Sequence, residues 1–114
     1  MIAVIFEVRP AEGHRDAYLA LAAKLREDLL KMDGFISVER FQSLTDPDKM
    51  LSLSFWRDEE AVAAWRNHER HRATQSAGRG GVFAEYRLRV AAVRRDYGME
   101  DRAEAPADSR AHHA

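Results

Sequence analysis

The chain has 114 residues, which is the size of a single domain with one hydrophobic core. It contains no cysteine, so disulfide scaffolds, thiolate zinc sites and cysteine nucleophiles are excluded. Its 18 basic and 19 acidic side chains give a formal net charge of -1, and this balance argues against nucleic acid or an anionic membrane as a partner.

Residues 2–9 form a β-branched and aromatic run that predicts a strand, and Pro10 ends it because proline donates no backbone hydrogen bond. The same segment lacks a basic leader and is too short to span a membrane, so we expect a cytoplasmic protein with no membrane partner. Between Tyr18 and Met32, apolar residues recur at spacings of three and four. This periodicity predicts an amphipathic helix that ends at Gly34.

Two further strands are predicted over residues 35–44 and 50–56, because the polar segment 45–48 between them has the chemistry of a turn. They read as an antiparallel hairpin. In the second strand, apolar residues alternate with Ser52, Ser54 and Trp56, so that this second face can border a cavity.

A second helix is predicted to begin after Asp58, because an aspartate followed by two glutamates is typical of a helix N-terminus. On an ideal helix drawn from there, Val62, Trp65 and His68 share one side. This side changes from apolar to polar along the helix, which makes it the candidate wall of a functional site.

Glycines at 78, 80 and 81 mark a loop, and residues 82–93 then show the longest strand pattern of the chain. Alternation puts Phe83 on the side of the charged residues and Tyr86 and Leu88 on the other, and such a strand suits contact with a partner sheet. Residues 98–114 hold no large apolar side chain after Met99. We therefore expect one domain over residues 1–97 and, over 98–114, a mobile tail or an arm that orders on a partner.

The predicted order of strand, helix, strand, strand, helix, strand is the βαββαβ arrangement of an α+β, ferredoxin-like fold. It implies a four-stranded antiparallel sheet with both helices on one face. The other face needs a cover, and a second copy of so short a chain is the simplest one. We therefore expect a homodimer.

Three motifs in this order give the sequence a family resemblance: GFISVE at 34–39, LSFWRDEEAV at 53–62 and AWRNH at 64–68, followed by His71. The chain resembles the antibiotic biosynthesis monooxygenase (ABM) domain family over residues 1–97. The resemblance implies a dimeric α/β barrel with one pocket per subunit between the sheet and the helices. Members include quinone-forming oxygenases that need no metal or flavin, because an electron-rich phenolate itself reduces oxygen, and heme-degrading monooxygenases.

The resemblance implies catalytic roles for Trp65, as a pocket tryptophan, and for His71, which would take a phenol proton near neutral pH. A purely structural role fits Trp65 equally well. His68 lies one helical turn before His71, and such a pair can bind a metal on a helix. The spacing fixes no third ligand, so no metal is expected. The alternative to a catalytic base is that these histidines are solvent-exposed or structural. Glu7, if it points inward, would have a raised pKa and serve as another base.

The remaining predicted site residues bind the substrate: His68, Phe41 and Trp56. Of these, Phe41 and Trp56 would pack a substrate ring together with Trp65. In the heme-degrading branch the resemblance implies an asparagine in the first strand and an axial histidine farther along the second helix. This chain has Glu7 and Gln75 there, so no cofactor is expected and heme is the alternative.

The sequence thus predicts a small monooxygenase that oxidises a phenolic or quinol-type molecule without metal or flavin. Two other functions stay open. One is a non-catalytic dimer whose pocket holds a small apolar ligand or is closed by side chains, and the other is a heme-binding or heme-degrading monooxygenase.

Overall fold

The structure is a computed structural model that describes the backbone of residues 1–75 and 81–112 and the side chains of residues 1–68 and 81–110. The predicted order of elements is confirmed, with one short helix added at the end. The elements are β1 (Ile2–Pro10), α1 (Arg15–Leu29), β2 (Phe35–Gln42), β3 (Met50–Trp56), α2 (Glu59–Gln75), β4 (Phe83–Ala92) and α3 (Ala107–His112).

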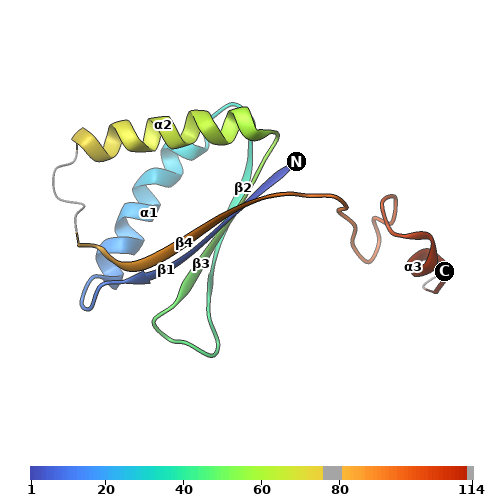
Figure 1. The fold of residues 1–114 in the computed structure, drawn as a ribbon, viewed down its shortest axis with the longest axis horizontal. Helices are drawn as coiled ribbons and strands as arrows, with labels where there is room; N and C mark the ends of the chain where they lie inside the picture. Colours follow the sequence, from blue (N-terminus) through green and yellow to red (C-terminus); the bar gives the residue numbers. More distant parts are fainter. Residues whose placement is uncertain (76–80, 113–114) are drawn as a thin grey trace.

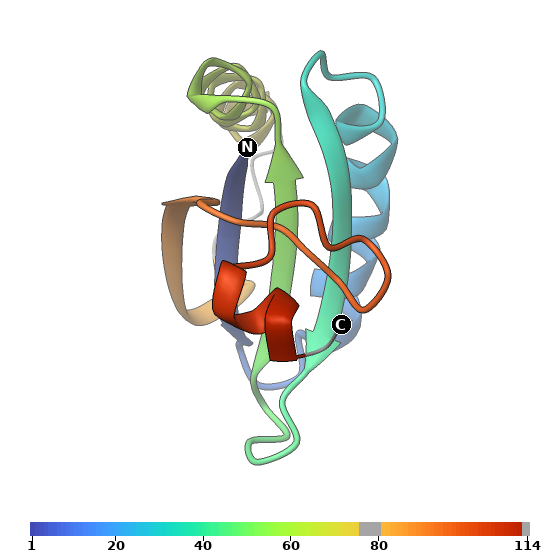
Figure 2. The ribbon, with the colours of Figure 1, turned by 90° about the vertical axis from the view of Figure 1, so that its right-hand side faces the viewer.

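The four strands form one antiparallel sheet in the order β2-β3-β1-β4, which confirms the ferredoxin-like α+β fold. Figures 1 and 2 show α1 and α2 on the same side of this sheet. We call this side the helix face and the other side the open face. None of the helices in the described part of the chain is long and apolar enough to cross a membrane.

Strand β1 carries the core because its alternate residues point to the helix face. Val4 packs against a cluster around Leu29, Trp56, Ala61 and Val62. Two residues along, Phe6 packs against a second cluster of Val8, Tyr18 and Met50. The helix face is therefore filled by two apolar clusters that follow one another along β1.

Trp56 is the largest fully buried side chain, with 1% of its surface exposed. Its indole N–H donates to the hydroxyl of Ser54 at 2.9 Å, so burial leaves no polar atom of the ring unpaired. Replacing a side chain of this size in the core by alanine costs about 3–5 kcal/mol.

The start of α2 is fixed by three neighbouring contacts. Asp58 Oδ1 accepts the backbone N–H of Ala61 at 2.9 Å, which confirms the predicted helix cap. The guanidinium of Arg57 donates to both carboxylate oxygens of Asp33, at 3.1 and 3.2 Å. Gly34 has a φ of 85°, and a Cβ there would come within 2.6 Å of the Ala61 Cβ, so the loop between α1 and β2 packs closely against the start of α2.

Candidate active site

Four aromatic rings meet where β1, α1 and β4 come together on the helix face. Phe83 of β4 lies 5.9 Å from Phe6, 5.8 Å from Tyr18 and 6.1 Å from Tyr86, measured between ring centroids. Phe6 and Tyr86 are 5.6 Å apart. These spacings and tilted orientations are those of favourable ring packing. We call these four residues the aromatic cluster.

The aromatic cluster is only partly covered. Tyr18 is 4% exposed, but Tyr86 is 61% exposed. Leu88 and Val90 follow Tyr86 on the same face, since they pair with Phe6 and Val4 of β1, and they are 51% and 44% exposed. Strand β4 thus presents a partly exposed row of apolar side chains beside the packed rings of the aromatic cluster. We call this row the wall; such a surface is suited to hold a flat, ring-containing molecule.

The position of Phe83 corrects the sequence-based expectation. Simple alternation placed it with Glu85 and Arg87, on the charged side of the strand. The β1–β4 register shifts between Arg9 and Pro10, so that Arg9 pairs with Glu85 and Pro10 with Phe83. This irregularity turns Phe83 to the helix face, and strict alternation fails because a bulge adds a residue to one strand.

Three of the predicted site residues form a row of rings. Trp56 and Trp65 have centroids 6.3 Å apart, and Trp65 stacks on the imidazole of His68 at 5.6 Å with an interplanar angle of 28°. Trp65 is half-buried and packs against the first core cluster. The two tryptophans are thus core residues in this structure, and the row ends on the more exposed ring of His68.

His68 faces an acidic residue of the other helix. Its Nε2 atom lies 3.6 Å from Oδ2 of Asp28 on α1. The side chain of Asp28 is 17% exposed, whereas that of His68 is 38% exposed. The Nε2 atom itself is buried and makes no hydrogen bond to any described residue. The exposed part of the imidazole is therefore a different edge of the ring.

Phe41 and Glu7 lie on the open face, away from these rings. Phe41 pairs with Leu51 of β3, whose neighbour Met50 belongs to the helix-face core. Glu7 lies between Phe6 and Val8, which both belong to that core. The structure therefore does not bring these two residues together with Trp65 and His68 within one subunit.

The pKa of Glu7 is shifted in the direction opposite to the one expected for an enclosed carboxyl. Arg89 donates to Glu7 Oε2 at 3.2 Å, and Lys49 Nζ lies 3.6 Å from the same oxygen. The hydrogen bond from Arg89, followed by the charge of Lys49, holds the pKa of this carboxyl below its ordinary value. The expectation of a raised pKa is wrong, because the side chain is on the open face beside two cations rather than enclosed in the core.

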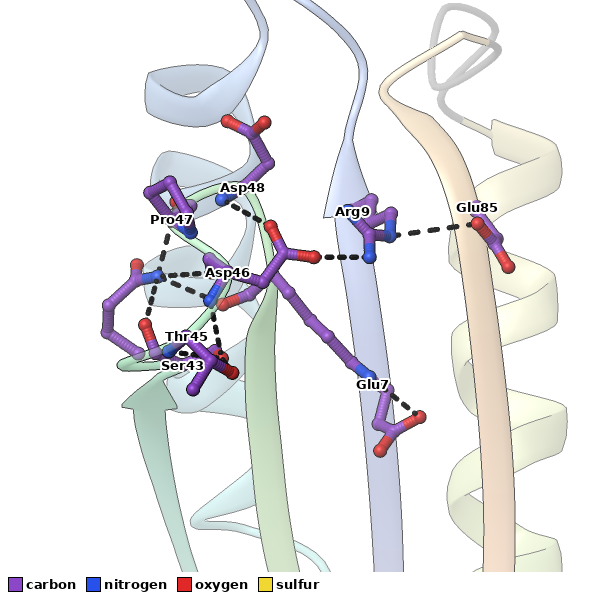
Figure 3. Close-up of polar contacts among 10 residues, drawn as sticks. Glu7, Arg9, Ser43, Thr45, Asp46, Pro47, Asp48 and Glu85 are labelled. Carbon is purple, nitrogen blue, oxygen red and sulfur yellow. Dashed lines mark hydrogen bonds and ion pairs between the residues drawn. The ribbon is translucent and has the colours of Figure 1, made fainter.

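A second ionic row crosses the same end of the sheet (Figure 3). Arg9 of β1 contacts the carboxylate of Asp46 in the β2–β3 loop, and it lies 3.7 Å from Glu85 of β4. The hydrogen bond that Asp46 accepts from the backbone of Asp48, with the neighbouring Arg9, keeps the pKa of Asp46 low. These charges join three chain segments, and they indicate a structural rather than a catalytic role for this part of the open face.

The side chain of His71 lies outside the described residues, so its predicted role as a base is carried forward as a proposal. Sequence reasoning missed the aromatic cluster. The apolar alternation of Tyr86 and Leu88 was visible, but it was read as a surface for a partner sheet. Nothing in the sequence ties Phe6 and Tyr18 to them, since that contact depends on how β1, α1 and β4 pack. Among the described residues, no group of three or more histidines, aspartates or glutamates is arranged to hold a metal.

Comparisons with known proteins agree on one family. A family model described as antibiotic biosynthesis monooxygenase matches residues 1–77. The chain is 48% identical over 93 residues to a jasmonate monooxygenase of Pyricularia oryzae; the match covers 82% of this chain but only 43% of that protein. The chain thus spans less than half the length of this relative.

Solved structures share the fold at low identity. Rv0793 from Mycobacterium tuberculosis has a TM-score of 0.72 and 20% identity, over 85% of this chain and 98% of that one. The heme-degrader MhuD from the same organism, with two hemes bound in its active site, has a TM-score of 0.69 and 17% identity, over 86% of this chain and 100% of that one. At such identities the likeness extends to the fold alone.

Proposed function

Since the chain belongs to the antibiotic biosynthesis monooxygenase family, we propose that it is a small monooxygenase that oxidises a phenolic or quinol-type ring without metal or flavin. The observation that carries the proposal is the aromatic cluster with its half-open wall on β4, where Tyr86 is 61% and Leu88 51% exposed. An aromatic substrate stacks on such a wall and excludes water from it.

The chemistry balances without a further reductant. A phenol with a free para position and one molecule of oxygen give a quinone and one molecule of water. One oxygen atom enters the ring, the other leaves as water, and the electrons come from the substrate. The protein has to bind the ring, keep it next to oxygen and accept the phenol proton, because the phenolate is the form that reduces oxygen.

Two histidines of α2 are proposed to serve this proton transfer. His71 is the base implied by the family resemblance. His68, one turn earlier, has its Nε2 next to the Asp28 carboxylate and exposes another edge of its ring. Trp65 fixes the position of that ring by stacking. Phe41 and Glu7 lie on the opposite face of the sheet, so we leave them out of this site, while Trp56 supports Trp65 from the core.

We also propose that the protein works as a homodimer in the cytoplasm. Support for the dimer comes from β4, an edge strand of the sheet in which every residue is exposed. The backbone of an edge strand is normally protected by another chain or element.

A second candidate substrate class is a cyclic oxylipin acid such as jasmonate, and the 48% identity to the jasmonate monooxygenase favours it. Hydroxylation of an unactivated carbon consumes two electrons and two protons in addition to oxygen, so this reaction needs a reduced nicotinamide or reduced flavin as co-reactant. The requirement for a reductant separates the two candidates.

Oxygen uptake by the purified full chain tests the proposal. We expect uptake with a panel of naphthols and hydroxylated quinone precursors in the presence of a chelator and without added flavin. Uptake only with jasmonate and a reductant would favour the second candidate. No uptake with either class would favour the non-catalytic, ligand-binding alternative, and a Soret shift on adding hemin would favour heme binding.

A further inference from the structure

The loop between β2 and β3 closes around a side-chain amide. The Nε2 atom of Gln42, the last residue of β2, donates to four backbone carbonyl oxygens at distances between 3.0 and 3.3 Å. These oxygens belong to Ser43, Asp46, Pro47 and Lys49. We call the four oxygens the carbonyl cup. Figure 1 shows the loop at the end of the hairpin that points away from α2.

The carbonyl cup offers more acceptors than the amide can serve. A side-chain amide nitrogen carries only two hydrogens, so four contacts at these distances have to share them. The carbonyls of Asp46 and Lys49 also accept backbone N–H groups, each at 3.1 Å. Among the described residues, Gln42 is the only hydrogen-bond donor to the carbonyls of Ser43 and Pro47. Two of the four carbonyls therefore depend on a neutral donor that they share.

The turn itself, rather than Gln42, holds the carbonyl cup in shape (Figure 3). The hydroxyl of Ser43 accepts the backbone N–H of Asp46 at 3.1 Å, and Asp46 Oδ1 accepts that of Asp48 at 3.1 Å. Arg9 of β1 contacts the carboxylate of Asp46 and ties the turn to the sheet. None of these bonds involves the side chain of Gln42, which is exposed and can turn out into solvent.

The size of the carbonyl cup favours a large monovalent cation. Its oxygens lie farther from the central nitrogen than the about 2.3–2.6 Å that Ca²⁺ requires, and none of them is a carboxylate oxygen. Rings of backbone carbonyls are the ligands that replace the hydration shell of K⁺ in selective channels. The spacing also suits hydrogen bonds from an ammonium group.

The charge of the turn favours a positive ligand as well. The turn carries the two carboxylates of Asp46 and Asp48. The ammonium of Lys49 lies against Glu7 of the sheet, 3.6 Å from its Oε2. Clustered acidic groups raise the local concentration of cations.

We propose that the carbonyl cup binds a monovalent cation of potassium size, K⁺ or an ammonium group, and that the Gln42 amide occupies the cup when the cation is absent. Binding exchanges shared, neutral hydrogen bonds for contacts between one full charge and four carbonyl dipoles. Because the ligands are backbone oxygens, the site needs no cluster of histidines or carboxylates. The proposal concerns the β2–β3 loop and stands independently of the oxygenation reaction.

Crystallography with thallium(I), which substitutes for K⁺ and has a strong anomalous signal, tests the site directly. In crystals of the wild-type chain soaked in thallium acetate, we expect an anomalous peak among the four oxygens and the Gln42 side chain turned outward. Gln42→Ala removes the competing amide and should bind the ion about tenfold more tightly. Gln42→Lys brings its own ammonium to the cup and should show no peak there.

Urea unfolding gives a second readout in solution. At fixed ionic strength, K⁺ or methylammonium replaces tetramethylammonium, whose cation is too large for the cup. A ligand that binds only the folded chain raises the unfolding midpoint and the effect saturates, so we expect this for the wild type and, at lower concentrations, for Gln42→Ala. Glu12→Ala, at an exposed site in the β1–α1 loop, is the matched control and should respond as the wild type does. The ion with the lower half-saturation concentration identifies the ligand as a metal ion or an amine.

Two results would overturn the proposal. The first is the absence of thallium from the carbonyl cup in both the wild type and Gln42→Ala. The second is an equal rise of the unfolding midpoint in the wild type and Gln42→Lys, which would show a general effect of salt.

Discussion

The Nε2 atom of His68 lies 3.6 Å from Oδ2 of Asp28, and this pair links α2 to α1. The Nε2 atom is buried, while 38% of the His68 side chain is exposed, so a different edge of the ring faces outward. The pair places a carboxylate of one helix beside an imidazole of the other.

If this pair acts in catalysis, His68→Gln should lower kcat by about 100-fold, because positioned general bases contribute about 10²–10⁴. Asp28→Asn should lower kcat by a smaller factor and change the pH profile of kcat, because it removes the orienting charge but keeps the imidazole. Glu27→Gln, the exposed neighbour on α1, is the control. Identical pH profiles for Asp28→Asn and wild type would remove Asp28 from the mechanism.

Tyr86 should contribute to substrate binding through its ring rather than its hydroxyl. Tyr86→Ala removes an exposed face of the aromatic cluster and should raise KM about tenfold, since one aromatic contact contributes about 0.5–1.5 kcal/mol beyond its buried area. Tyr86→Phe should keep a KM close to that of wild type. Arg87→Gln, on the opposite side of β4, is the matched control. If steady-state kinetics showed the same rise in KM for Tyr86→Phe and Tyr86→Ala, the hydroxyl would have the role instead.

Gly34 should be the glycine most sensitive to substitution within residues 1–75 and 81–112. Gly34→Ala combines a left-handed φ of 85° with a Cβ only 2.6 Å from the Ala61 Cβ, so we expect a loss of about 2–4 kcal/mol in the free energy of unfolding. Gly13→Ala shares a φ of 78° but has no atom within 4 Å of the new Cβ, and should lose only about 1–2 kcal/mol. Urea denaturation of both variants measures the difference, and equal losses would show that the close approach to α2 relaxes.

Glu7 should make the fold less stable in acid. Its pKa is lowered in the folded state by the hydrogen bond from Arg89, so the unfolded chain binds more protons in the acidic range. The contribution of ionised Glu7 to the free energy of unfolding is full above the ordinary carboxyl pKa. This contribution is lost as the pH falls through the ordinary pKa towards the lowered pKa of the folded state. Glu7→Gln should therefore flatten the dependence of stability on pH below neutrality, while Glu12→Gln should not. Parallel curves for Glu7→Gln and wild type would show that the Arg89 contact does not persist in solution.

The order of elements was accessible from sequence because each one has its own local signal. The Asp58 cap, the apolar periodicity of α1 and the turn before β3 are encoded within a few residues. The location of the site was less accessible. Phe83 changed faces because of a bulge at Arg9/Pro10, and Glu7 proved to be paired on the open face. Both depend on the register between β1 and β4, which no single segment encodes.

The wall formed by Tyr86 and Leu88 should bind a ring substrate for oxygenation. Labelled oxygen tests it most directly. The full chain is incubated with ¹⁸O₂ and the best substrate of the phenol panel, with a chelator and no flavin, and the product is analysed by mass spectrometry. We expect one ¹⁸O atom per quinone and the other in water, with the yield of quinone reduced in Tyr86→Ala. A product without ¹⁸O, or an equal yield from Tyr86→Ala, would contradict it.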